Sequence, residues 1–305
     1  MPTYQRAATL ERAVASALRQ THARLEVVIS DNGSTDRTEE VSRALAERDP
    51  RVRYLRHDQN LGSTANFNRL FETCRGEYVM MLADDDWLDP DYVELCLAAL
   101  RADPEAALVA GRARYISEER FARDGVRHEH RQADPAARVV DYLRCVDDNG
   151  VFYGLMPREV LRHASPLPNV LGNDWLHVAR IARQGHLRTL DEVRIHRELG
   201  GTSANIESIL ASFGQPGWQV RLPQLVIAFQ LLRDIGWAHP VYRDLGAAPR
   251  LVLGARGALA SIRWRALAWH LVTPAVIKLA RRPRGRRVWA LYDRLTRALG
   301  AGRLQ

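Results

Sequence analysis

The first 115 residues alternate short apolar runs with helix-like stretches, and this alternation most strongly constrains the fold. Runs at 25–29, 52–55 and 78–82 have the length and the apolar character of buried strands. Strands that alternate with helices pair in parallel, because each helix carries the chain back across the sheet. The pattern predicts an α/β fold with a doubly wound, mostly parallel sheet.

The helical stretches and the later strands can be placed by residue number. We expect helices at 8–20, 37–48, 63–73, 89–101, 139–147 and 172–185, and further strands at 106–115, 151–153 and 187–196. Beyond residue 206 the pattern is helical, with breaks at proline residues. The chain therefore divides into a catalytic part, 1–205, and a mostly helical C-terminal extension, 206–305.

The opening of the chain is unusual for such a fold. Met1-Pro2-Thr3-Tyr4 is loop-like and leads directly into a helix, whereas a doubly wound sheet begins with a strand. Either the first strand is missing, or the true start lies a few codons upstream. We favour the second interpretation.

The positive charge is concentrated in the extension. Of the 44 Lys and Arg residues, thirteen lie in 250–305 beside a single acid, Asp293, so this stretch carries +12 and the other residues sum to −4. Tryptophans are interleaved with these arginines, as in basic helices that lie on anionic membranes. The alternative is a helical cap packed on the catalytic part with a solvated Arg face. No nucleic-acid-binding motif accompanies the charge, so we expect no nucleic-acid partner.

Cellular location follows from what the sequence lacks. It has no run of about 18 apolar residues and no signal-peptide pattern. Its three cysteines, Cys74, Cys96 and Cys145, form no CxxC pair, as expected in a reducing compartment. We therefore expect a cytoplasmic protein, peripheral at the inner face of the cell membrane if the extension binds lipid.

Three adjacent carboxylates, Asp84-Asp85-Asp86, follow the apolar run at 78–82. Their mutual repulsion raises their pKa values unless a cation compensates, and Mg²⁺ or Mn²⁺ prefers such hard oxygen ligands. The carboxyl ends of strands are where open α/β sheets bind ligands. The alternative is a solvated acidic loop in which Asp89 caps the next helix.

A second polar segment, Asp31 to Asp36, follows the run at 25–29. Taken alone it is a turn with cap residues for the next helix. Its Asp or Asn side chains could instead contact a pyrimidine edge, with Thr3 and Tyr4 as a wall for the base.

Together these stretches resemble the family-2 glycosyltransferases, which have the GT-A fold. The matching stretches, in order, are Pro2-Thr3-Tyr4-Gln5-Arg6, Val28 to Asp36, Asn60-Leu61-Gly62 through Asn66 and Asn68, Arg75-Gly76-Glu77-Tyr78, and Leu82 to Pro90. They cover about residues 1–115. Each motif is weak alone, and their shared order is what makes the resemblance specific.

The resemblance implies roles for single residues. Thr3, Tyr4, Asp31 and Asn32 would line the nucleoside pocket, Asp84 would lie near the ribose, Asp85 would be the main metal ligand and Asp86 would support it. Two positions depart from the family: Ala83 stands where members often carry Asp, and Gln5 replaces an Asn. The first departure leaves the ribose contact to Asp84.

A weaker match lies in Gly172-Asn173-Asp174-Trp175, which resembles an acidic pair followed by an aromatic residue. The resemblance implies that Asp174 is the catalytic base, although Asn173 replaces a frequent Glu. The alternative is that Asn173 or Asp174 only caps a helix. Further on, Arg197 could pair with phosphate oxygens. The neighbouring His196 could share that site or be a buried, satisfied histidine.

The implied activity is a hexosyltransferase-type sugar transfer. A nucleotide-diphosphate sugar, with a UDP-sugar favoured, would donate to a hydroxyl of a glycan or lipid-linked acceptor in surface polysaccharide or glycolipid assembly. A single base and direct displacement predict inversion at the anomeric carbon. The rival interpretation is a non-catalytic relative that binds sugar nucleotides or acts as a scaffold.

Overall fold

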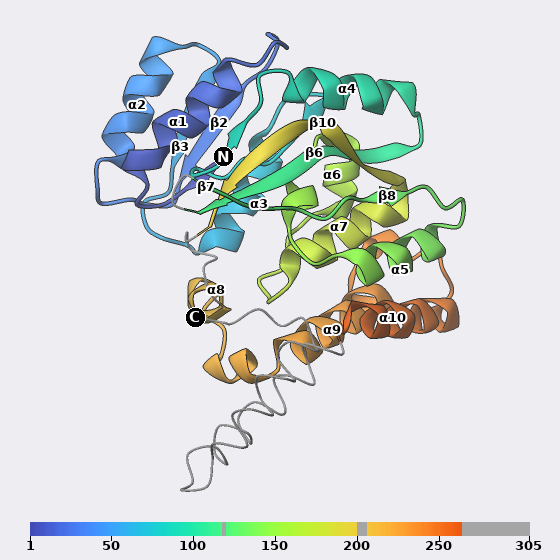
Figure 1. Cartoon of the computed structure of the whole chain (residues 1–305). Helices are drawn as coiled ribbons and strands as arrows, with labels where there is room; N and C mark the ends of the chain where they lie inside the picture. The colour runs from blue at the N-terminus through green and yellow to red at the C-terminus, as the bar shows by residue number, and fades with distance from the viewer. Residues whose placement is uncertain (118–119, 200–205, 264–305) are drawn as a thin grey trace, which may run out of the picture.

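The computed structural model describes residues 1–117, 120–199 and 206–263 of the 305-residue chain. The expected α/β architecture is present, with parallel pairing in one sheet and mixed pairing in another. Figure 1 shows the N-terminal helices and strands on one side, strands β6 (Ala106–Ser117) and β10 (His186–Glu198) in the centre, and the last helices below.

The N-terminal sheet contains three parallel strands in the order β1-β2-β3. Its elements are β1 (Pro2–Thr3), α1 (Ala7–Leu18), β2 (Val27–Asp31), α2 (Thr38–Arg48), β3 (Val52–Arg56) and α3 (Ser63–Thr73). All five residues of β2 are buried, because helices cover a parallel sheet. Its first three residues, Val27 to Ile29, are apolar, and the strand ends in the polar Ser30 and Asp31. Helix α1 buries Leu10, Ala13 and Val14 completely, which confirms the apolar face that its sequence predicts.

The second sheet is mixed, with the order β5-β10-β6-β7. Strand β10 runs parallel to β6 and antiparallel to β5 and β8, and a separate antiparallel pair joins β4 to β9. The remaining elements of this part are β4 (Tyr78–Val79), β5 (Trp87–Leu88), α4 (Tyr92–Ala102), β7 (Arg120–Asp124), β8 (Glu129–His130) and β9 (Met156–Pro157). The two-residue strand β5 matters most for the site, because it fixes the segment after the acidic triplet against the end of β10.

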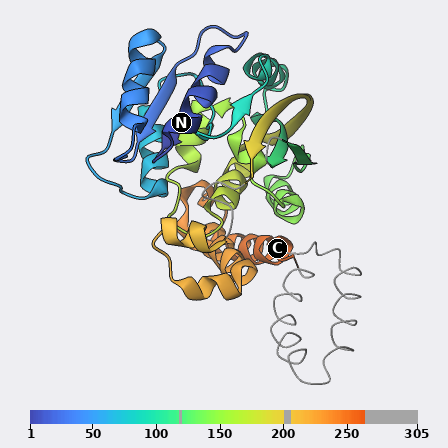
Figure 2. The same cartoon turned by 60° about the vertical axis from the view of Figure 1, so that its left-hand side comes forward.

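Helices dominate the rest of the described chain. They are α5 (Pro135–Cys145), η1 (Gly150–Tyr153), α6 (Arg158–Ala164), α7 (Asn173–Gln184), α8 (Ile206–Ser212), η2 (Gly217–Arg221), α9 (Pro223–Arg233), η3 (Asp234–Ala238), η4 (Pro240–Tyr242) and α10 (Ala247–Ser261). Figures 1 and 2 both show α9 and α10 lying together, next to α5. None of the helices in the described ranges is long and apolar enough to span a bilayer.

The described part of the C-terminal extension packs on the catalytic part. Leu210, Leu231 and Leu253 belong to the same buried apolar cluster as Leu10 and Ile29. Glycines on α10 allow close contact: a Cβ on Gly257 would lie 2.9 Å from the side chain of Leu143 on α5. A division of the chain after residue 205 stays a prediction, and any boundary there must cross a continuous hydrophobic core.

Three expected elements differ from the structure. The strand expected at 78–82 is limited to Tyr78–Val79; Met81 and Leu82 are buried as predicted, but a strand also needs a neighbouring backbone to pair with. The run at 151–153 forms a 3-10 helix, because a short buried apolar run does not by itself distinguish helix from strand. The opening residues, interpreted as loop-like, include the two-residue strand β1 at Pro2–Thr3.

Candidate active site

The acidic triplet lies between β4 and β5, and α1 holds this loop in place. The Arg12 guanidinium on α1 donates to the Asp85 carbonyl at 2.7 Å and pairs with Glu198, at the end of β10, at 2.9 Å. It also lies 4.1 Å over the ring of Trp87. Arg12 therefore ties the triplet loop to α1 and to the end of β10.

The three carboxylates of the triplet occupy different environments. Burial raises the pKa of Asp84 to about 6. The Arg6 guanidinium lies 3.9 Å from the Asp84 carboxylate and 3.8 Å from that of Asp85. Asp86 is only 1% exposed, and its Oδ2 accepts a hydrogen bond from Arg197 Nε at 2.8 Å. Asp84 and Asp85 thus face one cation, while Asp86 points into the protein.

Arg197, near the end of β10, is 7% exposed and surrounded by partners from the protein. Besides the Asp86 carboxylate, its Nη1 donates to Asn149 Oδ1 at 2.5 Å. Its guanidinium lies 4.1 Å over the ring of Tyr153. A phosphate contact for Arg197 stays a prediction; the observed role is to anchor the buried carboxylate of Asp86.

Asp174 is the second residue of α7 and is partly buried. Burial raises its pKa, while the Trp175 amide, which donates to Asp174 Oδ1 at 2.9 Å, lowers it. The preceding Gly172 has φ 78° and occupies the cap position of the helix. A Cβ on Gly172 would lie 2.9 Å from the side chain of Ile227 on α9, so α9 backs the start of the helix that carries Asp174.

Carboxylates that lie about ninety positions apart in the sequence act electrostatically on one tyrosine. Tyr153 is buried, and burial raises its pKa to about 12. The Arg197 charge lowers this pKa, and the charges of Asp86, Asp85 and Asp174 raise it. The charges of the triplet loop and of the start of α7 therefore both act on this buried side chain.

The four residues expected at the nucleoside lie at the carboxyl ends of β1 and β2. Thr3 is opposite Asp31 in the ladder and 3% exposed, whereas Tyr4 is 42% exposed. The Asn32 amide donates to Asn60 Oδ1 at 2.7 Å. The structure brings the four residues together, and their contact with a nucleoside stays a prediction.

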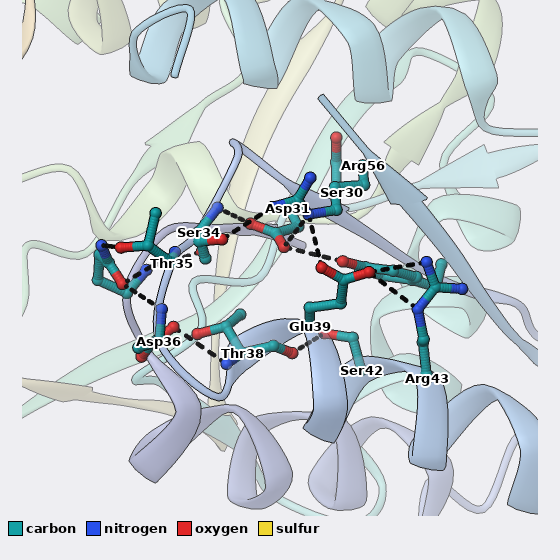
Figure 3. Close-up of polar contacts among 12 residues, drawn as sticks. Ser30, Asp31, Ser34, Thr35, Asp36, Thr38, Glu39, Ser42, Arg43 and Arg56 are labelled. Carbon is teal, nitrogen blue, oxygen red and sulfur yellow. Dashed lines mark hydrogen bonds and ion pairs between the residues drawn. The ribbon is translucent and has the colours of Figure 1, made fainter. Parts of the chain in front are cut away.

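Asp31 organises the loop that follows β2. Its Oδ1 accepts from the Ser34 amide at 2.9 Å and its Oδ2 from the Tyr54 hydroxyl at 2.8 Å, with Arg56 Nε 3.6 Å from Oδ2. Figure 3 shows Asp31, Ser34 and Arg56 gathered on one side of this loop, with Asp36 and Thr38 at the start of α2. The loop therefore has the turn conformation that its sequence predicts.

His196 is the satisfied histidine of the two alternatives. Its Nε2 lies 2.7 Å from Asp89 Oδ1, and its ring stacks on Trp87 at a centroid distance of 5.2 Å. This histidine joins β10 to the segment after the acidic triplet.

Sequence reasoning assigned no role to Arg6, Arg12, Asn149 or Tyr153. The two arginines lie in or beside the first matching stretch, but their carboxylate partners are more than 70 residues away. Asn149 and Tyr153 flank or belong to the run interpreted as a strand. Long-range pairing of this kind leaves no periodic signal in one sequence.

The described residues hold no group of three or more His, Cys, Asp or Glu side chains arranged around a common metal position. A cavity of about 630 Å³ does exist, but it lies beside the amino-terminal half of β2 and is lined by residues such as Val27, Val28, Met81 and Leu97. The cavity is therefore separate from the acidic triplet and is not the candidate site.

The amino-acid sequence is similar to one protein family and to several known proteins. The family model described as Glycosyl transferase family 2 matches residues 1–162. A chondroitin synthase of Escherichia coli is 40% identical over 119 residues, which are 39% of this chain and 17% of the synthase. This chain therefore corresponds to a small part of that larger protein.

Two solved structures illustrate the similar fold. The Staphylococcus aureus protein TarS, solved in complex with UDP, aligns with a TM-score of 0.54 at 13% identity, over 89% of this chain and 85% of that one. A mannosyltransferase of Pyrobaculum calidifontis, solved with GDP-Man and Mn²⁺, aligns with a TM-score of 0.52 at 20% identity, over 98% and 84%. At these identities the likeness concerns the fold alone.

Proposed function

This chain belongs to glycosyltransferase family 2, and from that premise we propose that it transfers a sugar from a nucleotide-diphosphate donor to an acceptor hydroxyl. The observation that carries the proposal is the pair of carboxylates of Asp84 and Asp85, which face one guanidinium at 3.9 and 3.8 Å, together with the separate carboxylate of Asp174 at the start of α7. A sugar transferase needs acidic groups for the donor's metal-bound diphosphate and a separate base for the acceptor, and these residues supply both from different elements.

Asp174 is the proposed base. As the acceptor oxygen attacks the anomeric carbon, the Asp174 carboxylate takes the hydroxyl proton, and the bond to the diphosphate oxygen breaks. Burial raises the pKa of Asp174 toward neutral pH. A carboxylate with a higher pKa binds a proton more readily and is therefore a better base. Direct displacement with one base gives inversion at the anomeric carbon.

We propose Mg²⁺ or Mn²⁺ as the cofactor, held by Asp85 and, beside it, Asp84. These two carboxylates already face a common cation, Arg6, and are hard oxygen donors, so their chemistry fits such an ion. When bound, the ion would supply positive charge to the departing diphosphate. Asp86 was expected to support the metal; its ion pair with Arg197 favours Asp85 and Asp84 instead.

The proposed donor is a UDP-sugar bound at Thr3, Tyr4, Asp31 and Asn32, and the proposed acceptor is a glycan or a lipid-linked glycan. The name of the chondroitin synthase relative and the UDP complex of the TarS neighbour support this choice. We place the reaction in surface polysaccharide or glycolipid assembly.

We further propose that the extension contacts an anionic membrane surface at the inner face of the cell membrane. Most of the basic segment 250–305 lies outside the described residues. Within the described part, α10 exposes Leu251, Val252 and Leu259 beside Arg256, and α9 exposes Phe229. Apolar side chains and arginines on exposed helices are typical of proteins that bind lipid headgroups.

The base is tested with an Asp174→Asn variant. We expect kcat to fall by at least about 100-fold, because the amide accepts no proton, while the KM for the donor changes little. The measurement is the rate of sugar transfer from UDP-sugars to oligosaccharide acceptors. An Asp147→Asn variant is the control. Asp147 is an exposed carboxylate, with 74% of its side chain accessible. An Asp174→Asn enzyme with near-normal turnover would overturn the assignment.

A further inference from the structure

The guanidinium of Arg6 lies against the two carboxylates proposed to hold the metal. Among its contacts, Arg6 Nε is 3.9 Å from Asp84 Oδ1, and Arg6 Nη2 is 3.8 Å from Asp85 Oδ2. Both distances are longer than a hydrogen bond, so these two ion pairs act through charge. The Arg6 side chain is 29% exposed, whereas those of Asp84 and Asp85 are 12% and 17% exposed. Arg6 is therefore the most accessible member of this cluster, and a ligand can reach it from solvent.

The backbone that leads to Arg6 has an unusual conformation. Gln5 has φ 56°, in the left-handed region that residues other than glycine rarely adopt. The segment after β2 holds this turn: the Gln5 amide donates to Ser34 Oγ at 3.0 Å, and the Arg6 amide donates to Thr38 Oγ1 at 2.9 Å. The position of Arg6 is therefore fixed relative to the loop that is proposed to bind the nucleoside.

Arg6 also occupies a helix position that disfavours it. It is the cap residue of α1, where Ser, Thr, Asp and Asn are preferred, and its side chain makes no cap hydrogen bond. The first turn of α1 has no acidic residue, and the positive end of the helix dipole repels a guanidinium. Local costs of this kind are expected where function outweighs the stability of single elements.

The balance of charge indicates what Arg6 can bind. Asp84, Asp85 and Arg6 together carry one net negative charge, and a divalent ion on the carboxylates would change this to one positive charge. The ion and the guanidinium would repel one another, because both would lie against the same two carboxylates. A diphosphate supplies the missing negative charge, and its oxygens match the paired N–H donors of a guanidinium.

We propose that Arg6 is a donor-binding residue that exchanges partners: it neutralises Asp84 and Asp85 until a divalent ion binds them, and it then pairs with the diphosphate of the donor. This inference rests on the proposed function of the site and adds a residue to it. Arg6 opposes binding of the ion alone and favours binding of the ion and the nucleotide together. The two ligands therefore strengthen each other's binding, as linkage requires.

An Arg6→Ala variant tests the exchange through two binding measurements. Mn²⁺ alone is titrated by electron paramagnetic resonance of the free ion, and UDP by calorimetry at saturating Mn²⁺. We expect the Kd for Mn²⁺ to fall about threefold or more, because a competing cation is lost. The Kd for UDP should rise about tenfold or more, because the diphosphate loses a charged donor. Uridine, which has no phosphate, should bind equally well to both proteins.

Two further variants separate the charge of Arg6 from its shape. Arg6→Lys keeps the charge, so the affinity for Mn²⁺ should return to that of the wild type. It should restore only part of the affinity for UDP, because an ammonium lacks the paired donors of a guanidinium. Arg48→Ala is the control: it removes the same charge from the end of α2, where 71% of the side chain is accessible. It should change neither affinity.

The signs of the changes distinguish the exchange from damage to the fold. Tighter Mn²⁺ binding together with weaker UDP binding in Arg6→Ala supports the inference. Unchanged UDP binding, weaker Mn²⁺ binding, or equal weakening of UDP and uridine overturns the role of Arg6 and leaves the proposed function intact. A wild type that binds UDP but transfers no sugar overturns the proposed function, while the binding role of Arg6 is still decided by its own measurements.

Discussion

At the scale of single residues, the triplet shows how identical side chains acquire different properties. Asp84 and Asp85 face Arg6, whereas Asp86 is buried against Arg197. The difference comes from partners that lie more than 70 residues away in the sequence, Arg6 just before α1 and Arg197 on β10. A buried carboxylate that is paired with a guanidinium is already neutralised, so an added cation gains least there.

This inequality predicts how the triplet responds to metal. In a thermal-shift screen of UDP, GDP, dTDP and CMP with and without Mn²⁺, we expect the cognate diphosphate to stabilise the wild type more when Mn²⁺ is present. A ligand at about 100 times its Kd adds about 2.7 kcal/mol. In Asp85→Asn the increment due to Mn²⁺ should disappear, because that variant loses the proposed main ligand.

Asp86→Asn is the matched comparison. It should lower the melting temperature of the free protein, because it leaves the Arg197 guanidinium buried without its charged partner. The increment due to Mn²⁺ should survive in it. If the stabilisation added by Mn²⁺ is lost in Asp86→Asn and kept in Asp85→Asn, then Asp86 and not Asp85 is the metal ligand.

At the scale of secondary-structure elements, one buried ion pair joins the catalytic part to the extension. The Arg180 guanidinium on α7 donates to both carboxylate oxygens of Asp234 in η3, at 3.0 and 2.6 Å. Its Nη1 donates to the carbonyls of Ala164 and Pro166 at 2.8 and 2.6 Å. All three guanidinium nitrogens of Arg180 therefore have a partner. The pair fixes the turn after α9 against α7.

Removal of one partner of this ion pair should lower the stability of the folded protein. We expect Asp234→Ala to lower the free energy of unfolding by about 3–5 kcal/mol, because Arg180 would be left as an unpaired buried charge. Glu159→Ala, which breaks the exposed Arg162–Glu159 pair on α6, should change it by less than about 1 kcal/mol. Urea denaturation measures both. Equal losses in the two variants would contradict the argument.

The sequence predicted the elements better than it predicted their contacts. Helices α1, α3 and α7 and strands β2 and β6 have clear periodicity or apolar runs, and each was expected close to where it lies. The run at 151–153 was interpreted wrongly, because burial and strand formation leave the same signal in a short segment.

The candidate site was predicted in part for a related reason. The conspicuous motifs indicated Asp85 and Asp174 as candidates, since acidic residues after strands or before helices stand out, and their roles stay predictions. Asn149 and Arg6 did not stand out. Their importance comes from what the fold places beside them, such as Arg197 for Asn149 and the triplet for Arg6. Sequence spacing carries no record of contacts between residues that lie this far apart.

At the scale of the whole molecule, the extension has two kinds of surface. One side of α10 carries small residues that pack on α5 and α9, including Gly254 and Gly257. Leu251 and Leu259 are exposed. Because α10 belongs to the core, removal of residues 250–305 would damage the fold, so a useful truncation must end after Arg263.

This arrangement predicts how the chain binds vesicles. We expect the full chain to float with vesicles that contain phosphatidylglycerol and to stay behind with neutral phosphatidylcholine vesicles. Binding should weaken at high salt, because arginines and anionic headgroups are screened. A chain that ends at Arg263 should bind these vesicles less than the full chain does. Substitution of Leu251 and Leu259 by Ser in the shortened chain should reduce its vesicle binding further.

Two matched variants serve as controls for the flotation assay. Leu61→Ser and Phe121→Ser remove exposed apolar side chains from the catalytic part, far from α10 in the chain. They should leave flotation unchanged. Equal binding of the full chain to anionic and neutral vesicles would contradict the electrostatic part of the proposal.

The contact between Gly172 and Ile227 has a consequence for recombination between related proteins. A chimera joined near residue 205 would combine a Gly172 from one parent with an α9 from another. A side chain larger than Ile227 would push on the backbone just before Asp174, and a smaller one would leave the start of α7 unsupported. The two positions must therefore be inherited together.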